Sequence, residues 1–284
     1  MSDDLGLPTA APGVTPARVL TIAGSDSGGG AGIQADMRTF ALLGLHACVA
    51  VTAVTVQNSL GVQGFQEIEP ETVAAQIHSV VTDIGVGAAK TGMLASAPII
   101  EAVADACIDL GIGRDRGVPL VVDPVCASMH GDALLATEAL DTLRTRLIPL
   151  ATVVTPNLDE VRLITGIDVV DATSQRAAAH ALHDLGALWA LVKGGHLRSS
   201  DHSPDLLFDG DEFHEFVHPR IATTHDHGAG DTLAAAIASA LAHGYSVPDA
   251  VSFAKRWVTR GLESAYPLGA GHGPVNPLWR VTAP

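Results

Sequence analysis

Short apolar runs alternate with segments of helical periodicity along nearly the whole chain. Continuous apolar runs bounded by Gly, Pro or Asp predict strands, and apolar residues at spacings of three and four predict helices. The predicted strands are Arg18–Ala23, His46–Val56, Ala88–Met93, Val118–Val122, Ala151–Thr155 and Leu188–Val192, followed by a hairpin of Leu206–Phe208 and Glu212–Val217. The predicted helices are Ile33–Leu43, Glu71–Asp83, Pro98–Leu110, Thr137–Leu147, Leu158–Thr165, Gln175–Leu185, Ala229–His243 and Pro248–Ala265.

This order of elements predicts the fold class. Continuous apolar strands need cover on both faces, so regular strand–helix alternation predicts an α/β domain with a mostly parallel central sheet between two helical layers. Residues 17–284 contain no internal repeat and no linker-like change of composition, and we expect them to form a single domain. Residues 1–16 are acidic and rich in Pro, Ala and Gly, which predicts a disordered N-terminal tail and not a signal peptide.

Composition narrows the choice of partners. The net charge is −15, from 31 acidic and 16 basic residues. Nucleic acids and anionic membranes need clustered cations, so we expect neither as a partner. A bound polyphosphate would depend on a few placed cations, backbone amides and a metal ion. The three cysteines are far apart in the sequence, which favours a reducing compartment, and we expect a cytoplasmic protein.

A glycine turn precedes the predicted helix at 229–243. It reads His227-Gly228-Ala229-Gly230-Asp231-Thr232. The unpaired N–H groups of a helix N-terminus favour an anion, and Asp231 adds a carboxylate beside that position. One interpretation is an ordinary Asp in the first helical turn. The other is that Asp231 accepts a proton from an attacking hydroxyl while the amides of residues 228–231 hold the charge of a transferred phosphoryl group.

Polar residues follow the predicted strands one after another. In an open parallel sheet, ligands bind at the carboxyl ends of the strands, so these residues predict one binding rim. They are Asp26, Gln57, Met93, Asp123, Asn157 and Lys193. The first loop, Gly24–Gly32, does not fit a dinucleotide fingerprint, because the third glycine would have to replace Ile33. It is either a flexible turn or a loop that a flat substrate approaches closely.

Two of these strand ends carry candidates for binding a metal ion and a phosphate. Asn157 and Glu160 have the spacing of a capping box, and Glu160 is alternatively a ligand for hydrated Mg²⁺. Asp123 is a second candidate for that ion. Lys193 opens a Gly-Gly loop, from which its ammonium group could reach a phosphate. The chain has only three lysines, and the other two are Lys90 and Lys255. The histidines have no convincing zinc spacing.

Seven motifs in order resemble the ribokinase-like superfamily and, within it, the hydroxymethylpyrimidine/phosphomethylpyrimidine kinases of thiamine biosynthesis. The resemblance covers nearly the whole chain after the tail. The motifs are IAGSDSGGGAGIQAD (22–36), TAVTVQN (52–58), KTGML (90–94), DPV (123–125), TPNLDE (155–160), KGGH (193–196) and HGAGDTL (227–233).

The resemblance implies a ribokinase-like three-layer α/β/α fold and ATP-dependent phosphorylation of 4-amino-5-hydroxymethyl-2-methylpyrimidine, and then of its monophosphate to the diphosphate. It implies that Gln57 hydrogen-bonds the aminopyrimidine, and that Gly24, Asp26, Met93 and Val125 belong to the substrate site. ATP and Mg²⁺ are the expected cofactors and a homodimer the expected assembly. The residues expected at ATP are Lys193, Asn157, Thr223 and Lys255, with Glu160 and Asp123 at the metal ion.

One position differs from the pattern of many pyrimidine kinases. They have Gly-Thr-Gly-Cys where this chain has Gly228-Ala229-Gly230-Asp231, which resembles the sugar kinases whose Asp is the catalytic base. We therefore expect Asp231 to be the base, assisted by the amides of Gly228, Ala229 and Gly230. The alternatives are a pyridoxal kinase of the same superfamily and a non-catalytic pyrimidine-binding regulator.

Overall fold

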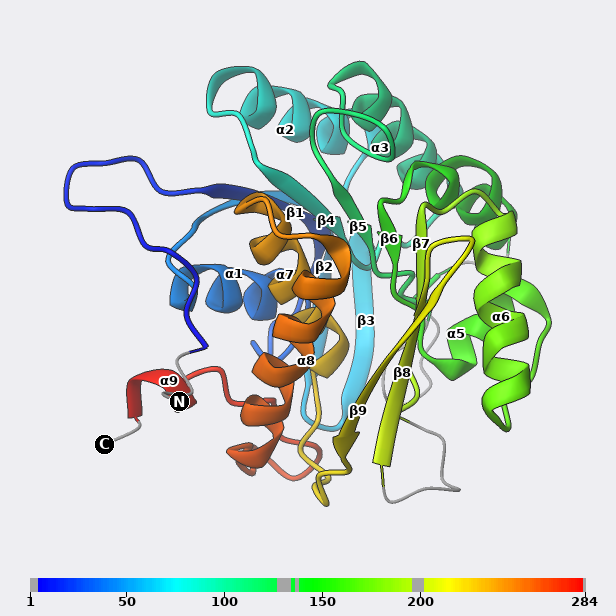
Figure 1. Ribbon diagram of the computed structural model, residues 1–284. Helices are drawn as coiled ribbons and strands as arrows, with labels where there is room; N and C mark the ends of the chain where they lie inside the picture. Colours follow the sequence, from blue (N-terminus) through cyan, green and yellow to red (C-terminus); the bar gives the residue numbers. More distant parts are fainter. Residues whose placement is uncertain (1–4, 127–133, 136–137, 196–201, 283–284) are drawn as a thin grey trace.

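The computed structural model describes residues 5–126, 134–135, 138–195 and 202–282. Within them, nine strands form one sheet in the order β3-β2-β1-β4-β5-β6-β7-β8-β9 (Figure 1). The strands are β1 (Arg18–Ser25), β2 (His46–Asn58), β3 (Gly61–Glu67), β4 (Ala88–Thr91), β5 (Leu120–Val122), β6 (Val153–Val154), β7 (Trp189–Val192), β8 (His202–Phe208) and β9 (Phe213–Pro219).

The sheet is mostly parallel, as the sequence predicts. Its six central strands, from β2 to β7, pair in parallel, and antiparallel strands stand at both edges. The predicted hairpin at the end of the sheet is present as β8 and β9. The edge strand β3 was not predicted, and it pairs with β2 from Asn58↔Gly61 onward. Most of its side chains are exposed or half-buried, so it carries no apolar run that would mark it as a strand.

Helices cover both faces of this sheet (Figure 1). Helices α1, α7 and α8 share one core cluster, and α2, α3, α5 and α6 share the other. The helices are α1 (Gly32–Leu42), α2 (Pro70–Asp83), α3 (Ala97–Asp109), α4 (Ala139–Thr142), α5 (Leu158–Thr165), α6 (Ala172–Asp184), α7 (Ala229–Ala242), α8 (Val247–Glu263) and α9 (Trp279–Thr282). This is the three-layer α/β/α architecture that the sequence predicts.

Two segments differ from the sequence expectations. The helix expected over 137–147 is short: α4 is followed by a π-helical turn, Leu143–Leu147, and a 3₁₀ turn, Ile148–Leu150, that contains Pro149. Thr137 lies outside the described residues. In the expected N-terminal tail, Leu5 and Leu7 are buried in the core cluster of α1, α7 and α8, so this part of the segment packs against the domain.

The strand order places a switch point between β1 and β4. The chain leaves β1 through α1 on one face and leaves β4 through α3 on the other, which opens a crevice where the two strands end. Helix α7 contacts β1, β4 and β5 from beneath that crevice. Ten successive residues of α7, Thr232–Leu241, are buried, so its N-terminus is held firmly at this point.

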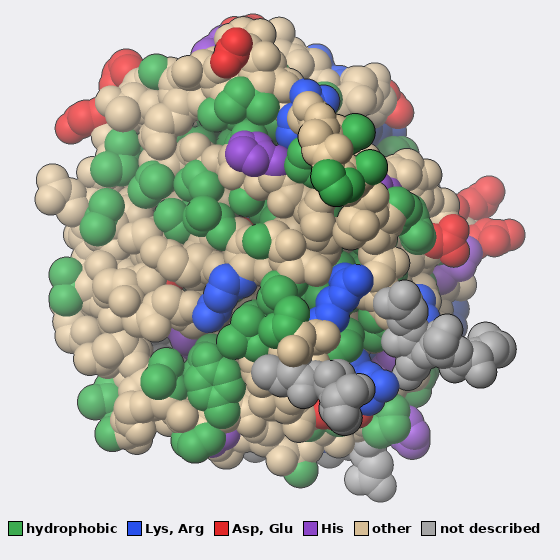
Figure 2. Space-filling model, turned by 90° about the vertical axis from the view of Figure 1, so that its left-hand side faces the viewer, with side chains coloured by type: hydrophobic (Ala, Val, Ile, Leu, Met, Phe, Trp, Pro, Cys, Tyr) green, Lys and Arg blue, Asp and Glu red, His purple; other side chains and the backbone are tan. Residues whose placement is uncertain are grey.

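The exterior fits the acidic composition. On the side of the molecule that carries α1, Figure 2 shows Lys and Arg side chains separated from one another, without a continuous basic patch. In the described part of the chain, no helix combines the length and the apolar character needed to cross a membrane.

Candidate active site

The glycine turn at α7 is fixed by close contact with the first glycine loop. Gly228 is the N-cap of α7 and has φ of +78°, in the left-handed region. A Cβ atom added there would lie 2.0 Å from the carbonyl oxygen of Gly30, so only glycine fits. The two glycine loops, at residues 24–32 and 227–232, therefore meet backbone to backbone.

The first turn of α7 presents backbone N–H groups to the crevice, but the expected contribution of the Ala229 N–H needs correction. The N–H of Ala229 donates to the carbonyl oxygen of Asp226 at 3.0 Å, so it is not available to a phosphoryl group. Gly230 and Asp231 also lie in the first helical turn, where backbone N–H groups lack an acceptor within the helix. Their amides and the positive end of the helix dipole favour an anion at this point.

Asp231 belongs to a buried group of charges that the sequence analysis did not assemble. Its Oδ1 lies 3.0 Å from Nζ of Lys90, and the same Nζ lies 2.9 Å from Oδ2 of Asp36. Thr21 donates to that Oδ2 at 2.6 Å. Lys90 and Asp36 are fully buried, while the side chain of Asp231 keeps 16% exposure. Asp231 is thus the member of this group that reaches the crevice.

One cation serves two carboxylates here, and the balance between burial and the stabilising contacts decides which of them ionises more easily. Burial raises the pKa of Asp36 to about 7, against the opposing effect of Lys90. Burial also tends to raise the pKa of Asp231, but the charge of Lys90 and hydrogen bonds from Lys90 and the Gly32 amide outweigh it and lower that pKa. For Lys90, the carboxylates overcome the effect of burial and raise the pKa. Asp231 is therefore ionised at neutral pH.

A second charged group lies beside Gly230. A Cβ atom added to Gly230 would be 3.3 Å from Nζ of Lys193 and 3.6 Å from Oδ2 of Asp123. Lys193 forms an ion pair with Oδ1 of Asp123 at 3.1 Å, and Thr155 donates to that oxygen at 3.2 Å. The remaining oxygen of Asp123 thus faces the glycine turn. Lys193 and Asp123 meet at the rim, as their places at strand ends predict.

Glu160 completes this group from the first turn of α5. It forms a capping box with Asn157: the Asn157 N–H donates to Oε2 at 2.7 Å, and the Glu160 N–H donates to Oδ1 of Asn157 at 2.9 Å. The capping-box interpretation is confirmed, and it gives Asn157 a structural role. Burial and the nearby charge of Asp123 raise the pKa of Glu160 to about 7, although Lys193 opposes them.

The two carboxylates fit a hydrated Mg²⁺ ion and not a complete protein cage. Mg²⁺ typically uses one or two carboxylates together with water and substrate phosphates. Asp123 and Glu160 are both buried, and the charge of Asp123 contributes to the raised pKa of Glu160. Among the residues that the structure describes, no three His, Cys, Asp or Glu side chains gather in a metal-binding group. Any cation at Asp123 and Glu160 would need phosphate oxygens as well.

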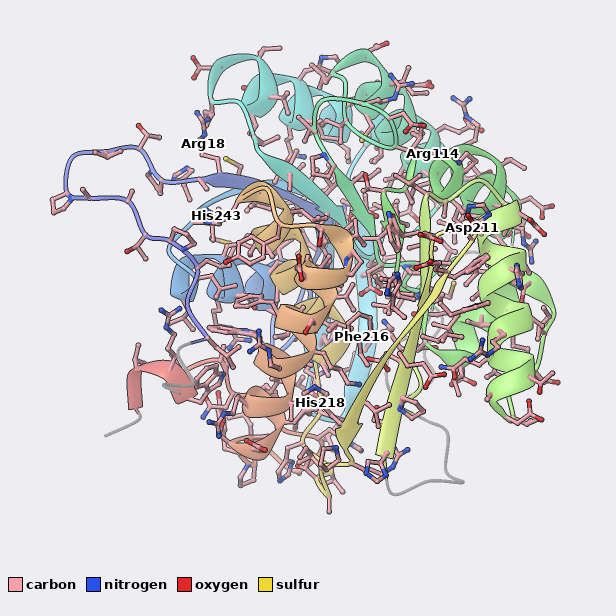
Figure 3. The ribbon with its side chains drawn as sticks, in the orientation of Figure 1. Arg18, Arg114, Asp211, Phe216, His218 and His243 are labelled. Carbon is pink, nitrogen blue, oxygen red and sulfur yellow. The ribbon has the colours of Figure 1, made fainter. Side chains whose placement is uncertain are left out.

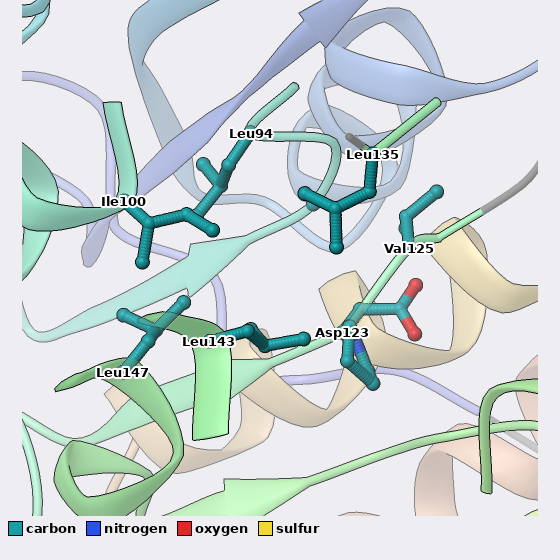
Figure 4. A pocket seen from close by; sticks show the side chains of 9 residues that line it. Leu94, Ile100, Asp123, Val125, Leu135, Leu143 and Leu147 are labelled. Atoms are coloured by element: carbon teal, nitrogen blue, oxygen red, sulfur yellow. The ribbon is translucent and has the colours of Figure 1, made fainter. Parts of the chain in front are cut away.

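The expected substrate residues fall into two places. Gly24 and Met93 are in contact: the Gly24 N–H donates to the Met93 carbonyl at 3.2 Å, and a Cβ on Gly24 would be 3.1 Å from the Met93 sulfur. Val125 instead lines a cavity of about 10 Å³ with Leu94, Ile100 and other apolar side chains. Figure 4 shows Asp123 at one end of this group, its carboxylate turned away from Ile100. The cavity is far too small for a heteroaromatic ring.

Asp26 has a different position from the one expected. It is buried, and its carboxylate accepts hydrogen bonds from the amides of Gly28, Gly30 and Ala31 at 2.7–2.9 Å. His227 is its fourth partner, with Nε2 at 2.9 Å from Oδ2. Burial tends to raise the pKa of Asp26, but His227 and the amides outweigh it and lower that pKa. Asp26 thus shapes the glycine loop, chiefly through Oδ2, while Oδ1 accepts from the Gly28 N–H alone.

Lys255 also differs from the expectation of ATP contact. It lies on α8, only 7% exposed, and its Nζ is 2.7 Å from Oδ2 of Asp205. The other oxygen of Asp205 accepts from the Gly194 N–H at 2.8 Å. Phe216 and His218 on β9 lie beside α8 and close this region (Figure 3). Lys255 therefore supports the loop after Lys193 from below.

Replacing Lys255 by Met is expected to lower the free energy of unfolding by about 3–5 kcal/mol, because Asp205 would remain buried without its cation. The loop that carries Lys193 would also loosen, which raises KM for ATP. Urea denaturation and ATP titration measure the two effects. Arg256→Met, at the exposed next position of α8, is the matched control and should stay within about 0.5 kcal/mol of wild type. Equal stability of the two variants would contradict the supporting role.

Thr223 lies in a shallow, open concavity of the surface. With Ala222, Thr224 and His225 it lines a volume of about 520 Å³ just before the glycine turn. The expected ATP contact of Thr223 stays a prediction.

The chain is similar in structure to solved kinases. The chain is similar to the ADP complex of Bacillus subtilis pyridoxal kinase, with a TM-score of 0.85 and 34% identity over 95% of this chain and 100% of that one. It is also similar to phosphomethylpyrimidine kinase from Clostridium difficile, with a TM-score of 0.75 and 37% identity over 86% and 98% of the two chains. The protein therefore has the ribokinase-like kinase fold.

The family follows from the sequence comparisons. The model of the family described as phosphomethylpyrimidine kinase matches residues 26–276. A hydroxymethylpyrimidine/phosphomethylpyrimidine kinase from Mycobacterium leprae is 69% identical over 97% of this chain and 99% of its own length. The chain belongs to the phosphomethylpyrimidine kinase family.

Proposed function

We propose that this chain transfers the γ-phosphoryl group of ATP to the hydroxymethyl group of 4-amino-5-hydroxymethyl-2-methylpyrimidine, and then phosphorylates the monophosphate to the diphosphate. Family membership and the 69% identical relative support the reaction and the substrate. The observation that carries the mechanism is the position of Asp231, an ionised carboxylate in the first turn of α7, held by the buried Lys90 and open to the crevice.

In the first reaction the oxygen of the substrate's hydroxymethyl group attacks the γ-phosphorus of ATP, and Asp231 accepts the proton of that hydroxyl group. A new P–O bond forms to the substrate, the bond to the β-phosphate oxygen breaks, and ADP leaves with that electron pair. The amides of Gly230 and Asp231 donate to the oxygens of the group in transfer, where negative charge has to be stabilised. Lys193, 3.3 Å from a Cβ position on Gly230, neutralises phosphate charge on the other side.

Mg²⁺ would be held by Asp123 and Glu160 together with the ATP phosphates, and when bound it neutralises phosphate charge. Glu160→Gln keeps an oxygen that can accept from the Asn157 N–H but removes the negative charge. We expect this variant to need about 10–100-fold more Mg²⁺ for half-maximal activity. Asn157→Ser, which preserves an N-cap acceptor, is the control for damage to α5. A Mg²⁺ titration curve unchanged from wild type would remove Glu160 from the metal site.

Pyridoxal phosphorylation is the second candidate activity, because pyridoxal kinases share the fold at 34% identity. The family model and the 69% identical relative favour the pyrimidine. Measuring kcat/KM for the pyrimidine alcohol and for pyridoxal side by side separates them: we expect the pyrimidine to be preferred, and a preference for pyridoxal would overturn the assignment. A non-catalytic regulator is disfavoured because the ionised Asp231 and the buried Glu160 are both in place.

We further infer a homodimer and a cytoplasmic location. The hairpin of β2 and β3 leaves Val54, Val56, Leu60 and Phe65 exposed, which suits a surface that pairs with a second copy. Sedimentation of the full chain tests this assembly.

The cytoplasmic location is inferred from the cysteines. Cys48, Cys107 and Cys126 are free and buried, which suits a reducing compartment.

A further inference from the structure

His227 stands between the first glycine loop and the residue expected to recognise the substrate. Its Nε2 lies 2.9 Å from Oδ2 of Asp26 and 3.3 Å from Nε2 of Gln57. The ring lies directly against Gly30, where an added Cβ atom would be 2.4 Å from Cδ2 of His227. The side chain of His227 is only 12% exposed, so these contacts leave it little freedom.

The backbone of His227 is held independently of its ring. The His227 N–H donates to the carbonyl oxygen of Gly273 at 3.2 Å, and the N–H of Val275 donates to the carbonyl oxygen of His227 at 3.0 Å. Replacing the imidazole therefore leaves in place the backbone contacts that position the turn at Gly228.

The protons of this group can be assigned from Asp26. Three backbone amides donate to its carboxylate, so Asp26 acts purely as an acceptor. An acceptor at 2.9 Å from Nε2 of His227 requires that this nitrogen carry a hydrogen and donate it. The same N–H cannot accept a hydrogen bond from the amide nitrogen of Gln57. Each donor faces an acceptor only when the Gln57 amide turns its oxygen toward His227 and its NH₂ group away from His227.

We infer that His227 is a positioning residue for substrate specificity: held by Asp26, it fixes the Gln57 amide so that its NH₂ group, a donor, meets the substrate ring. The inference rests on the proposed function, in which Gln57 contacts the pyrimidine. A donor fixed in this direction selects a heteroaromatic ring with a nitrogen acceptor at that edge. An analogue in which a CH group replaces that ring nitrogen offers no acceptor to the fixed donor, and a freely rotating amide would discriminate less between the two rings.

The test compares His227→Leu with His227→Gln. Leu fills the space but donates no hydrogen bond, whereas Gln has an NH₂ group that can donate to both Asp26 and Gln57. For the Leu variant we expect the dissociation constant of the pyrimidine alcohol, measured by calorimetry without ATP, to rise about 10-fold. The ratio of kcat/KM for the pyrimidine over the analogue with CH in place of that ring nitrogen should fall by about 10-fold as well. KM for ATP should stay unchanged, and the Gln variant should recover most of the ratio.

Two results would overturn the inference. One is a Leu variant that keeps the wild-type ratio and dissociation constant. The other is an equal loss in the Leu and Gln variants with kcat and KM for ATP also impaired, which would indicate general damage to the turn. Failure of the proposed function looks different: wild-type protein itself would then neither bind nor phosphorylate the pyrimidine, and this inference would fall with it.

Discussion

Asp231→Asn is expected to lower kcat for the pyrimidine alcohol by about 10²–10⁴-fold, the usual contribution of a general base. Asn has the same shape but cannot accept the hydroxyl proton. ATP binding should be retained, because Lys193 is held by Asp123 and not by this carboxylate. Steady-state kinetics measure the first effect and calorimetric titration with nucleotide the second.

The control for this variant is Asp159→Asn. Asp159 is an exposed carboxylate in the first turn of α5, next to Glu160 but outside the buried groups. Its removal changes the net charge by the same amount and should leave kcat close to wild type. A near-normal kcat in Asp231→Asn, with the protein folded, would refute the assignment of Asp231 as the base.

Lys90→Met is expected to have the largest effect on both stability and pH dependence. It leaves Asp36 buried without a cation, which typically costs about 3–5 kcal/mol of folding free energy. The charge of Lys90 favours the ionised form of Asp231, so its loss raises the pKa of that carboxyl. Asp231 would then be protonated at a higher pH, and activity would fail earlier on acidification. Denaturation and the pH profile of kcat/KM measure the two effects.

Asp36→Asn is the companion variant that separates these effects. It removes a like charge from the neighbourhood of Asp231 but keeps Lys90 paired with it. The acidic limb of the pH profile should therefore stay where it is or move to lower pH, opposite to the shift in Lys90→Met. A shift toward higher pH in both variants, or in neither, would contradict the account of how Lys90 acts.

Much of the fold could be predicted because burial dictates the pattern of its central strands. Strands β5 and β7 are covered on both faces and therefore appear as continuous apolar runs, and β1 is apolar apart from Thr21 in its buried part. Strand β3 could not be predicted in this way, because an edge strand with mostly exposed side chains needs no such run. The prediction of a regular α-helix over 137–147 was wrong. The spacing of apolar residues in the sequence does not distinguish an α-helix from a widened π turn.

The site was predictable as a set of strand ends but not as a set of contacts. Position after a parallel strand was enough to bring Asp123, Lys193 and Glu160 together. Position along the chain could not show that Lys255 pairs with Asp205, because their contact joins α8 to β8. Lys90 did leave a signal: it is a charged residue inside a fully buried strand, and such a residue needs a partner.

The most direct test of Asp231 as proton acceptor uses the two acceptors of the proposed reaction sequence. The hydroxymethyl group has to lose a proton when it attacks. The phosphate monoester has a second pKa of about 6, so it is already a dianion at pH 8 and needs no base. Single-turnover formation of monophosphate and of diphosphate, followed by mass spectrometry at pH 8, compares wild type with Asp231→Asn. We predict that the variant loses about 10²–10⁴-fold on the alcohol and far less on the monophosphate. Equal losses on both acceptors would contradict the role of Asp231 as the base.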